Sequence, residues 1–459
     1  MIGRKGWQGG GEERLEVRDP IYGLIEYGDL EEKIINHRIV QRLRNIKQLA
    51  MAHLVYPGAL HTRFDHSLGV MHIAGVMGKS LSLDEDACQL LRLAGLLHDV
   101  GHGPFSHVCE QVMQTNASPE SIKGIHTDQF HEALTVRIIG EYLGELIPDK
   151  YKGELISIFQ KTNKVNLIKN IITGPIDADK IDYLLRDSYF TGVKYGVFDR
   201  HKVIESLRRV ELGSGQEQVG ISEEGIFAVE QLLLGRYHMR MQVSGHRIRR
   251  IADAMLVRAI NLALQENLAS VERVFLVNTT DLKDFLEQDD NTLLELILAQ
   301  SQGPARDLVL RLKERRLLKE VFSIPISEAA FRDHVDLVSV KELDDVKIKR
   351  AEERLAEMWQ MPREFVIVDK QSIRNPTYKD PVPKLDPNSI MVLVSVDEKP
   401  VRKDFPQVSA VFKNLQEPFM EGLCVYAPLE GSKEERKAFC KKHKEKILEV
   451  ILQVAKEGE

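Results

Sequence analysis

Apolar residues recur at helical spacing along the chain from about residue 30 to about residue 268. This spacing predicts helices at 66–80, 105–114, 129–146, 151–160, 166–171 and 178–188, and one long helix over roughly 223–267. Ser82 to Glu85 (Ser-Leu-Asp-Glu) resembles a capping box that opens a further, very apolar helix ending at His98 and Asp99. The first part of the chain is therefore expected to be mainly helical.

Short β segments interrupt and follow this helical part. Alternation around turn residues predicts a short strand or hairpin within 17–26 and a hairpin within 210–221. Beyond residue 268, the pattern predicts a helical, charged stretch at 280–320, β-rich stretches at 363–370 and 390–396, a Pro-rich connector at 376–387 and a helix from 432 to the end. We expect a mainly α fold, with a flexible lead at 1–14, a helical core with small hairpins at 15–325 and a smaller C-terminal α+β lobe at 326–459.

Composition narrows the class of protein. The 459 residues are 43% hydrophobic and 29% charged, which is ordinary for a folded chain. A net charge of -6 argues against a protein that coats nucleic acid. Apolar runs are too short for a membrane helix, and the Gly-rich, charged start lacks the apolar stretch of a secretion signal. Four cysteines without a paired motif are typical of free thiols, so we expect a reducing cytoplasm.

Histidine is concentrated in one region, because nine of the 15 histidines lie between His53 and His131. A lone His98-Asp99 pair is most simply a capping feature, but the end of an apolar helix carries partial negative charge that a cation would relieve. His66 and Asp179 lie at the starts of two other predicted helices. Two imidazoles and two carboxylates form a ligand set suited to Mn, Fe, Zn, Ni or Co. A divalent metal site is therefore expected.

These four positions resemble the H…HD…D signature of the HD-domain metal-dependent phosphohydrolases. Within that group, further segments resemble the deoxynucleoside triphosphate triphosphohydrolases. These segments are DPIYG at 19–23, QRLRNIKQL at 41–49, YPGA at 56–59, HSLGV at 66–70 and LHDVGHGPFSH at 97–107. The closest branch includes the animal enzyme that joins a SAM domain to an HD domain, and bacterial relatives without it. We expect no SAM domain here.

The resemblance implies hydrolysis of a deoxynucleoside triphosphate (dNTP) to a deoxynucleoside and inorganic triphosphate, through attack of metal-activated water on the α-phosphate. His107 is then the general acid for the leaving 5′-oxygen, and Glu110, one turn later, orients it. His102 and His131 match histidines that line the phosphates and the attacking water. His126 is a nearby alternative to His131 for this role. Their structural alternative is helix capping or support of other site residues.

The resemblance also implies a set of substrate contacts. These are Arg63, Lys180 and Arg236 for the triphosphate, Tyr183 and Asp187 for the 3′-hydroxyl, and Gln48 and Leu49 for the sugar. The bland alternative for the cations is a solvated charged face. A magnesium ion on the substrate phosphates is a further expectation from this class of chemistry.

Some positions depart from the family pattern. Ser244 stands where many relatives have a tyrosine that packs against the sugar, which weakens the expected preference for dNTPs over ribonucleoside triphosphates (NTPs). Gln41 and Arg44 match a site for an activating guanine nucleotide between subunits, whereas Glu16 and Asn36 do not. We expect a homo-oligomer, either a dimer or a tetramer, with Arg209 and Arg247 as candidate interface or solvated residues.

Three functions remain open from the sequence. The first is dNTP triphosphohydrolysis. The second is hydrolysis of another nucleotide phosphoester, such as an NTP, a nucleoside monophosphate or a modified nucleotide, which Ser244 favours. The third is a non-catalytic nucleotide sensor or nucleic-acid binder, against which the presence of all four metal-type ligands and His107 argues.

Overall fold

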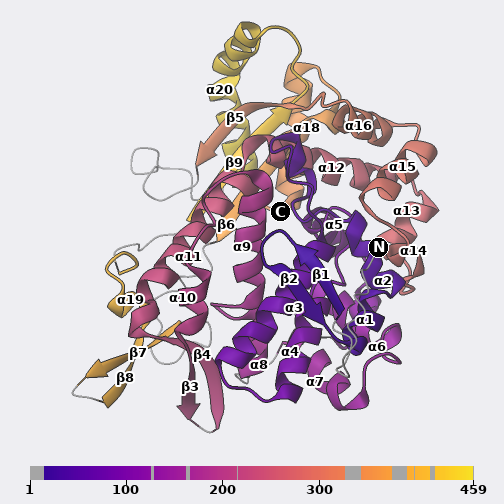
Figure 1. Ribbon diagram of the computed structural model, residues 1–459. Coiled ribbons are helices and arrows are strands. Elements are labelled where there is room, and N and C mark those ends of the chain that lie inside the picture. Colours follow the sequence, from indigo (N-terminus) through magenta and orange to yellow (C-terminus); the bar gives the residue numbers. More distant parts are fainter. Residues whose placement is uncertain are drawn as a thin grey trace. The chain divides into compact units, whose positions relative to one another are not determined.

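The computed structural model describes residues 15–125, 129–161, 166–213, 215–325, 343–374, 390–396, 399–413 and 419–457 (Figure 1). It divides into two compact units whose segments alternate along the chain. The first comprises 1–246, 269–295 and 379–416, and the second comprises 247–268, 296–378 and 417–459. The predicted limits at 15–325 and 326–459 stay a prediction, and the predicted lead and Pro-rich connector lie outside the described residues.

The first unit begins with the predicted hairpin, formed by β1 (Leu15–Asp19) and β2 (Gly23–Tyr27). The Asp19 carboxylate accepts hydrogen bonds from the amides of Ile21 and Tyr22, at 2.8 and 3.0 Å, and so closes the turn. Gly23 has a φ of 80°, a conformation that favours glycine. Two short helices follow, α1 (Asp29–Ile35) and α2 (Arg38–Gln41).

Three helices form the centre of the first unit: α3 (Arg63–Ser80), α4 (Glu85–Leu97) and α9 (Ala178–Thr191). Helix α3 is capped by Thr62, whose side chain accepts from the Asp65 amide. The capping box expected at Ser82 is wrong. The residue that caps α4 is Asp84, whose side chain accepts from the Ala87 amide at 2.8 Å. Ser82 lies two residues earlier, outside the helix, with a φ of 53°.

Smaller helices and a four-stranded sheet complete the first unit. The other described helices here are α5 (His107–Asn116), α6 (Phe130–Glu141), α7 (Asp149–Phe159), α8 (Leu167–Thr173), α10 (Arg200–Glu205), α13 (Ala269–Val274), α14 (Lys283–Leu286) and α19 (Phe405–Val408). The sheet has the order β3 (Leu207–Gly213), β4 (Gln216–Ser222), β7 (Met391–Val396) and β8 (Lys399–Asp404). Its first two strands form the second predicted hairpin.

The prediction of one long helix over 223–267 is wrong, because the helix is interrupted within this range. Helix α11 (Ile226–Met239) passes into a π-helical turn at Arg240–Ser244, and α12 (Arg247–Gln265) begins afterwards. The Gly245 amide donates to the Arg240 carbonyl at 2.7 Å, which closes the wide turn. Such turns occur frequently at functional sites. Here the break also separates the two units, since α12 belongs to the second.

The second unit packs helices against an antiparallel sheet of order β5 (Lys319–Pro325), β9 (Phe419–Ala427) and β6 (Ile367–Arg374). Its core joins α18 (Asp345–Trp359), through Leu355, to α20 (Lys433–Lys456), through Ile447 and Ile451, and to Val425 of the sheet. Helix α16 (Pro304–Lys313) packs on α12, while α15 (Asp290–Gln300) begins in the first unit. The predicted mainly α fold with small sheets is confirmed.

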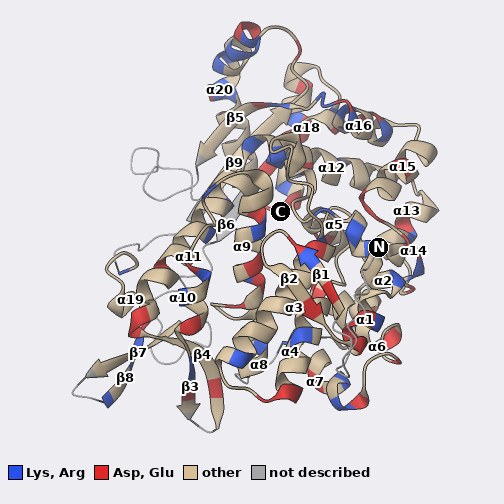
Figure 2. Ribbon diagram, in the orientation of Figure 1, with Lys and Arg blue, Asp and Glu red and all other residues tan. Residues whose placement is uncertain are grey.

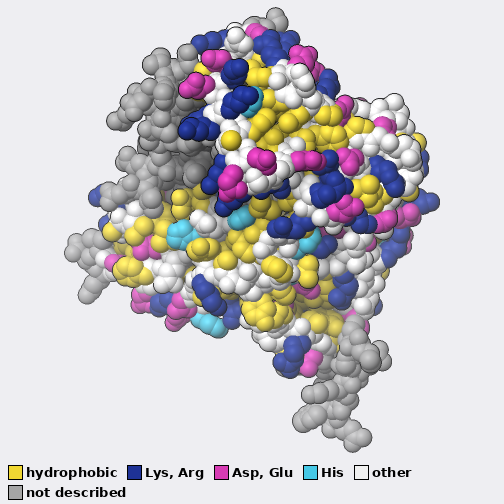
Figure 3. Space-filling view, turned by 90° about the horizontal axis from the view of Figure 1, so that it is seen from above, with side chains coloured by type: hydrophobic (Ala, Val, Ile, Leu, Met, Phe, Trp, Pro, Cys, Tyr) yellow, Lys and Arg dark blue, Asp and Glu magenta, His cyan; other side chains and the backbone are white. Residues whose placement is uncertain are grey.

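Charged side chains of both signs are interspersed within each unit rather than segregated (Figure 2). On the face that Figure 3 draws, hydrophobic side chains are exposed among charged ones. No described helix combines the length and apolar character needed to cross a lipid bilayer. Cys88, Cys109, Cys424 and Cys440 are free thiols.

Candidate active site

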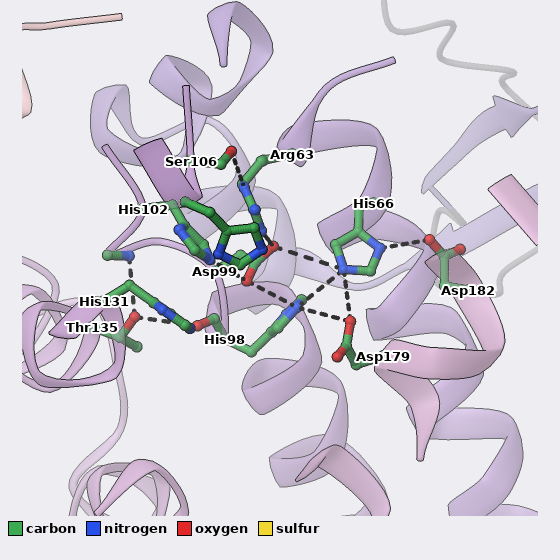
Figure 4. A network of polar contacts seen from close by, with 12 residues as sticks. Arg63, His66, His98, Asp99, His102, Ser106, His131, Thr135, Asp179 and Asp182 are labelled. Carbon is green, nitrogen blue, oxygen red and sulfur yellow. Dashed lines mark hydrogen bonds and ion pairs between the residues drawn. The ribbon is translucent and has the colours of Figure 1, made fainter. Parts of the chain in front are cut away.

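The four predicted metal ligands converge where α3, α4 and α9 meet (Figure 4). His66 lies in the first turn of α3, His98 caps the end of α4 and precedes Asp99, and Asp179 lies in the first turn of α9. Nε2 of His66 is 3.2 Å from Nε2 of His98 and 3.0 Å from Oδ1 of Asp179. Oxygen atoms of Asp99 lie 3.3 Å from Nε2 of His98 and 3.7 Å from Nε2 of His66.

These spacings fit a bound divalent ion. With metal–ligand bonds of about 2.1 Å, neighbouring ligands of an octahedral ion lie about 3 Å apart. Nδ1 of His98 donates to the Gly95 carbonyl at 2.8 Å, and Nδ1 of His66 donates to Oδ2 of Asp182 at 2.7 Å. Each Nε2 therefore faces the other imidazole and the carboxylates, and the neutral rings would offer their Nε2 lone pairs to an ion. Such a cluster of donors could hold a metal ion.

Electrostatics point the same way. Burial opposes protonation of His66, but its hydrogen bonds to Asp179 and Asp182 and the charge of Asp99 raise its pKa to about 10. Burial lowers the pKa of His98. The carboxylates thus favour a positive charge at His66, which a proton or a bound metal ion can supply, whereas burial favours the neutral ring of His98. The nitrogen and oxygen donors suit several first-row transition metals.

A buried network lies behind His66 and holds its ring. Both oxygens of Asp182 accept from Arg186, each at 2.9 Å, and Arg186 also donates to Asp19 of the N-terminal hairpin at 2.8 Å. Arg186 and Asp182 are completely buried. Gly69 makes room for them, because a Cβ there would lie 1.9 Å from Oδ1 of Asp182. A carboxylate that holds the second nitrogen of a ligating histidine fixes its tautomer and orientation.

Arg63, predicted to bind the triphosphate, is buried and directed at the predicted metal ligands. Its guanidinium forms an ion pair with Asp99 and donates to Oγ of Ser106 at 2.8 Å. Burial opposes ionisation of Asp99, yet the charge of Arg63 and the nearby histidines hold the pKa of that carboxyl well below its usual range. Arg63 therefore contacts a metal-type ligand directly in this structure.

The predicted acid–base residues form a second cluster beside Asp99. Glu110 accepts from Nδ1 of His107 at 3.3 Å and from Nδ1 of His131 at 3.0 Å. The rings of His131 and His102 stack at 3.9 Å, and Nε2 of His102 lies 3.4 Å from Asp99. The His107 side chain is 65% exposed, whereas His102 is buried. An exposed imidazole braced by a buried carboxylate is suited to exchanging a proton with a ligand.

The pKa directions within this cluster differ from residue to residue. Burial and the charge of Arg63 lower the pKa of His102 well below its usual range, so this ring is neutral. Burial opposes protonation of His131, but its hydrogen bond to Glu110 raises its pKa. Burial opposes ionisation of Glu110, and the hydrogen bonds from His107 and His131 nevertheless lower its pKa. His126, the rival for His131, lies outside the described residues.

Tyr183 and Asp187 follow Asp179 along one stripe of α9, as their spacing predicts. Asp187 accepts from Nε2 of His61 at 2.8 Å, and the His61 carbonyl accepts from the backbone amide of Gln48 at 3.1 Å. Gln48 and Asp187, both predicted to contact the sugar, are thus joined through His61. No sequence pattern assigned a role to His61, which lies five residues before His66.

The three remaining predicted substrate residues, Leu49, Lys180 and Arg236, differ in their surroundings. Leu49 is buried beside Gln48. Lys180 turns away from the metal-type ligands, since its amine pairs with Asp177 and donates to the Gly174 carbonyl at 2.8 Å. Arg236 of α11 is half-buried and close enough to Tyr183 for its charge to lower the pKa of the phenol, against the larger effect of burial.

The residues considered for nucleotide activation have local partners. Arg44 donates to Oε1 of Gln41 at 2.8 Å and stacks on Phe64 at 3.7 Å. Arg209 forms a two-point contact with Glu217 across the β3–β4 hairpin. These contacts do not test an activating nucleotide, which stays a prediction.

Two family models match the chain: one described as the HD domain at residues 63–186, and one described as the HD associated region at 198–455. The chain belongs to the HD-domain family. An uncharacterised protein of Methanocaldococcus jannaschii is 32% identical to it over 444 residues, which cover 95% of this chain and 84% of that protein. Membership places this HD-domain protein among hydrolases whose domain binds a divalent metal.

Named and solved relatives agree with this placement. A deoxynucleoside triphosphate triphosphohydrolase of Bos taurus is 29% identical over 349 residues, or 66% of the HD-domain chain and 58% of the bovine protein. A phosphohydrolase of Bacteroides thetaiotaomicron superposes with a TM-score of 0.69 at 24% identity, covering 90% of this chain and all of that one, which shows the fold. A hypothetical protein of Aquifex aeolicus has a TM-score of 0.65 at 28% identity, with 95% and 100% coverage.

Proposed function

We propose that this protein hydrolyses deoxynucleoside triphosphates to deoxynucleosides and inorganic triphosphate. The observation that carries the proposal is the cluster of His66, His98 and Asp179, with Asp99 lying 3.7 and 3.3 Å from the two histidines and the Glu110-braced His107 close by. The named relatives that act on dNTPs support the substrate class. When bound, a divalent ion supplies positive charge that polarises phosphoryl oxygens and acidifies water.

The chain's own residues then divide the work. His107 donates a proton from Nε2 to the leaving 5′-oxygen while its Nδ1 stays hydrogen-bonded to Glu110, which keeps the ring oriented. Arg63 neutralises Asp99 and brings positive charge next to the phosphates. His102 and His131, a stacked pair beside Asp99, line the phosphates and the attacking water. Each of these roles depends on the hydrogen bond, ion pair or ring contact that the side chain makes in the structure.

The sugar and triphosphate contacts extend the proposal along α9 and α11. Tyr183 and Asp187 hold the 3′-hydroxyl, and the His61 bridge to Gln48 keeps Asp187 directed toward the sugar with Leu49 beside it. Arg236 contacts the triphosphate, next to Tyr183. Lys180 does so only if its amine leaves Asp177 on binding. A magnesium ion on the phosphates completes the charge balance.

Another nucleotide phosphoester is the second candidate, and Ser244 is the observation that favours it. Ser244 ends the π-helical turn, whose Gln242 carbonyl accepts from the Tyr56 hydroxyl at 2.9 Å. A serine leaves more room than the tyrosine of many relatives at the place that a ribose 2′-hydroxyl would occupy. On this alternative, NTPs are turned over as well as dNTPs.

Assembly and regulation are part of the proposal. We propose a homo-oligomer, a dimer or a tetramer, in the cytoplasm, with the C-terminal lobe from about residue 326 contributing contacts between subunits. An activating nucleotide would bind near Gln41 and Arg44. Light scattering of the purified chain, with and without each nucleotide, measures the mass of the assembly directly.

A turnover screen tests the activity. All dNTPs and NTPs are supplied singly and in pairs with Mn²⁺ or Mg²⁺, because one nucleotide can be an activator rather than the substrate, and the products are separated by chromatography. Deoxynucleoside and triphosphate support the proposal, while pyrophosphate or orthophosphate with a nucleotide product supports the alternative. A complete lack of turnover across the screen, from a protein that metal analysis shows to be loaded, contradicts the hydrolysis of dNTPs and of NTPs.

A further inference from the structure

The turn that precedes α5 has an unusual backbone. Phe105 and Ser106 have φ values of 56° and 55°, in the left-handed region that favours glycine, although neither is glycine. Such conformations persist when the surrounding structure holds them, and they cluster at functional sites. The next residue, His107, begins α5 and carries the proposed acid. The direction of the turn therefore sets where His107 starts.

Asp290, at the start of α15, holds this turn from a distant part of the sequence. Its Oδ1 accepts from the Phe105 amide at 2.7 Å, and its Oδ2 accepts from the amide and the amine of Lys47 at 3.0 and 3.4 Å. The Asp290 side chain is completely buried. One carboxylate thus joins the turn to the Lys47 segment.

Ser106 continues the connection to the metal-type ligands. Its Oγ donates to the Lys47 carbonyl at 3.2 Å and accepts from Nε of Arg63 at 2.8 Å, and Arg63 is paired with Asp99 (Figure 4). Asp290 is therefore connected to Ser106 through the Phe105 peptide and the Lys47 backbone, and from Ser106 through Arg63 to Asp99. Movement of the turn would displace both Arg63 and the start of α5.

The segment just before Asp290 fixes the earlier part of the same loop. Arg42 donates to the carbonyls of Val100 and His102, at 3.2 and 2.7 Å, and to the Gln288 carbonyl at 3.3 Å. Gly103 packs tightly here, because a Cβ at that position would lie 2.8 Å from the Phe285 ring. Residues 285–290 lie in the HD associated region, outside the match to the HD domain itself.

We infer that Asp290 is a positioning residue for the hydrolase. It holds the Phe105–Ser106 turn so that Arg63 reaches Asp99 and His107 faces the substrate, and the associated region thereby contributes to the active site. This inference rests on the proposed function for its catalytic consequence. The hydrogen bonds by which Asp290 holds the turn are a property of the folded chain, and amide hydrogen exchange measures them without turnover.

The test compares Asp290→Asn and Asp290→Ala with Asp289→Asn in the full-length, metal-loaded protein. Asp289 is the matched control, because it has the same charge and lies next to Asp290, but caps α15 by accepting from the amides of Asn291 and Thr292. Asn at 290 retains one acceptor and is the milder change if the Ala variant does not fold. The measurements are amide hydrogen exchange of the 100–107 segment, metal content, melting temperature, kcat and KM.

We expect faster exchange at Phe105 in both Asp290 variants, and a kcat lower by about 10- to 100-fold with one metal ion retained per chain. Asp289→Asn should change neither. A purely structural role predicts a lower melting temperature with an unchanged kcat per folded molecule, which would overturn the inference, as would unchanged exchange. If the wild type hydrolyses no nucleotide, the proposed function fails, and the exchange result alone decides whether Asp290 holds the turn.

Discussion

Asp182 is the most informative single position around the metal-type ligands, because it touches one of them without being one. Its carboxylate accepts three hydrogen bonds: from Nδ1 of His66 at 2.7 Å, and from Nε and a terminal nitrogen of Arg186 at 2.9 Å each. Oδ2 takes two of them and Oδ1 takes one. Replacement by Asn or by Ala therefore removes a defined number of contacts while leaving all four proposed ligands in place.

The expected magnitudes follow from that count. In Asp182→Asn, the side-chain oxygen at the Oδ2 position keeps two hydrogen bonds, while the new NH₂ group faces Arg186. Arg186 then loses one charge-assisted hydrogen bond, worth about 1.5–3 kcal/mol. His66 keeps a weaker, neutral acceptor, so metal affinity should fall about tenfold. Asp182→Ala leaves Arg186 paired only with Asp19, which should cost about 3–5 kcal/mol of unfolding free energy, and should lower metal affinity about 100-fold.

Two measurements check these values. Mn²⁺ affinity is determined by titration against a chelator of known affinity, and unfolding by urea is followed in excess chelator, so that metal binding does not contribute to stability. Asp149→Asn and Asp149→Ala are the controls, because that side chain is 97% exposed. An Ala variant at 182 that binds Mn²⁺ as tightly as the wild type would refute the reasoning, since His66 would then need no partner at Nδ1.

Three further predictions concern other parts of the chain. His107→Gln should keep one metal ion per chain and lose most of kcat, and loss of the metal in that variant would show that its role is misassigned. Ser244→Tyr should raise the ratio of kcat/KM for dNTPs to that for NTPs, whereas an unchanged ratio would remove our account of that position. Glu352→Ala in the second unit should lower the unfolding free energy by about 3 kcal/mol in urea, because Glu352 is buried and paired with Arg258, and a change below about 0.5 kcal/mol would contradict this.

Local pattern was sufficient for most helices and for proposing four metal ligands, which the structure brings close together. The apolar spacing around His98 and Asp99 and the polar starts at His66 and Asp179 are features of single helices, and each is visible in a short window of sequence. The break at 240–246 was missed, although Ser244 and Gly245 are residues that favour turns, because apolar residues at helical spacing resume directly after it from Ile248. The cap of α4 was misplaced by two residues for a related reason, since Ser82 and Asp84 are both good capping residues.

The contacts that organise the site were harder to see. Arg186 and Asp182 have the (i, i+4) spacing of a helical pair, which was a usable indication, but their connection to Asp19 spans 167 positions. The bond between Asp290 and Phe105 spans 185 positions. Contacts between segments so far apart leave no periodic trace in one sequence. They had to come from the fold.

We propose that His66, His98, Asp99 and Asp179 together hold one divalent ion. Metal analysis of the purified wild type and of Asp179→Ala, each reloaded with Mn²⁺ and desalted, tests it most directly. The account predicts one ion per chain in the wild type and almost none in a folded Asp179→Ala protein. Equal metal content in the two proteins would contradict it.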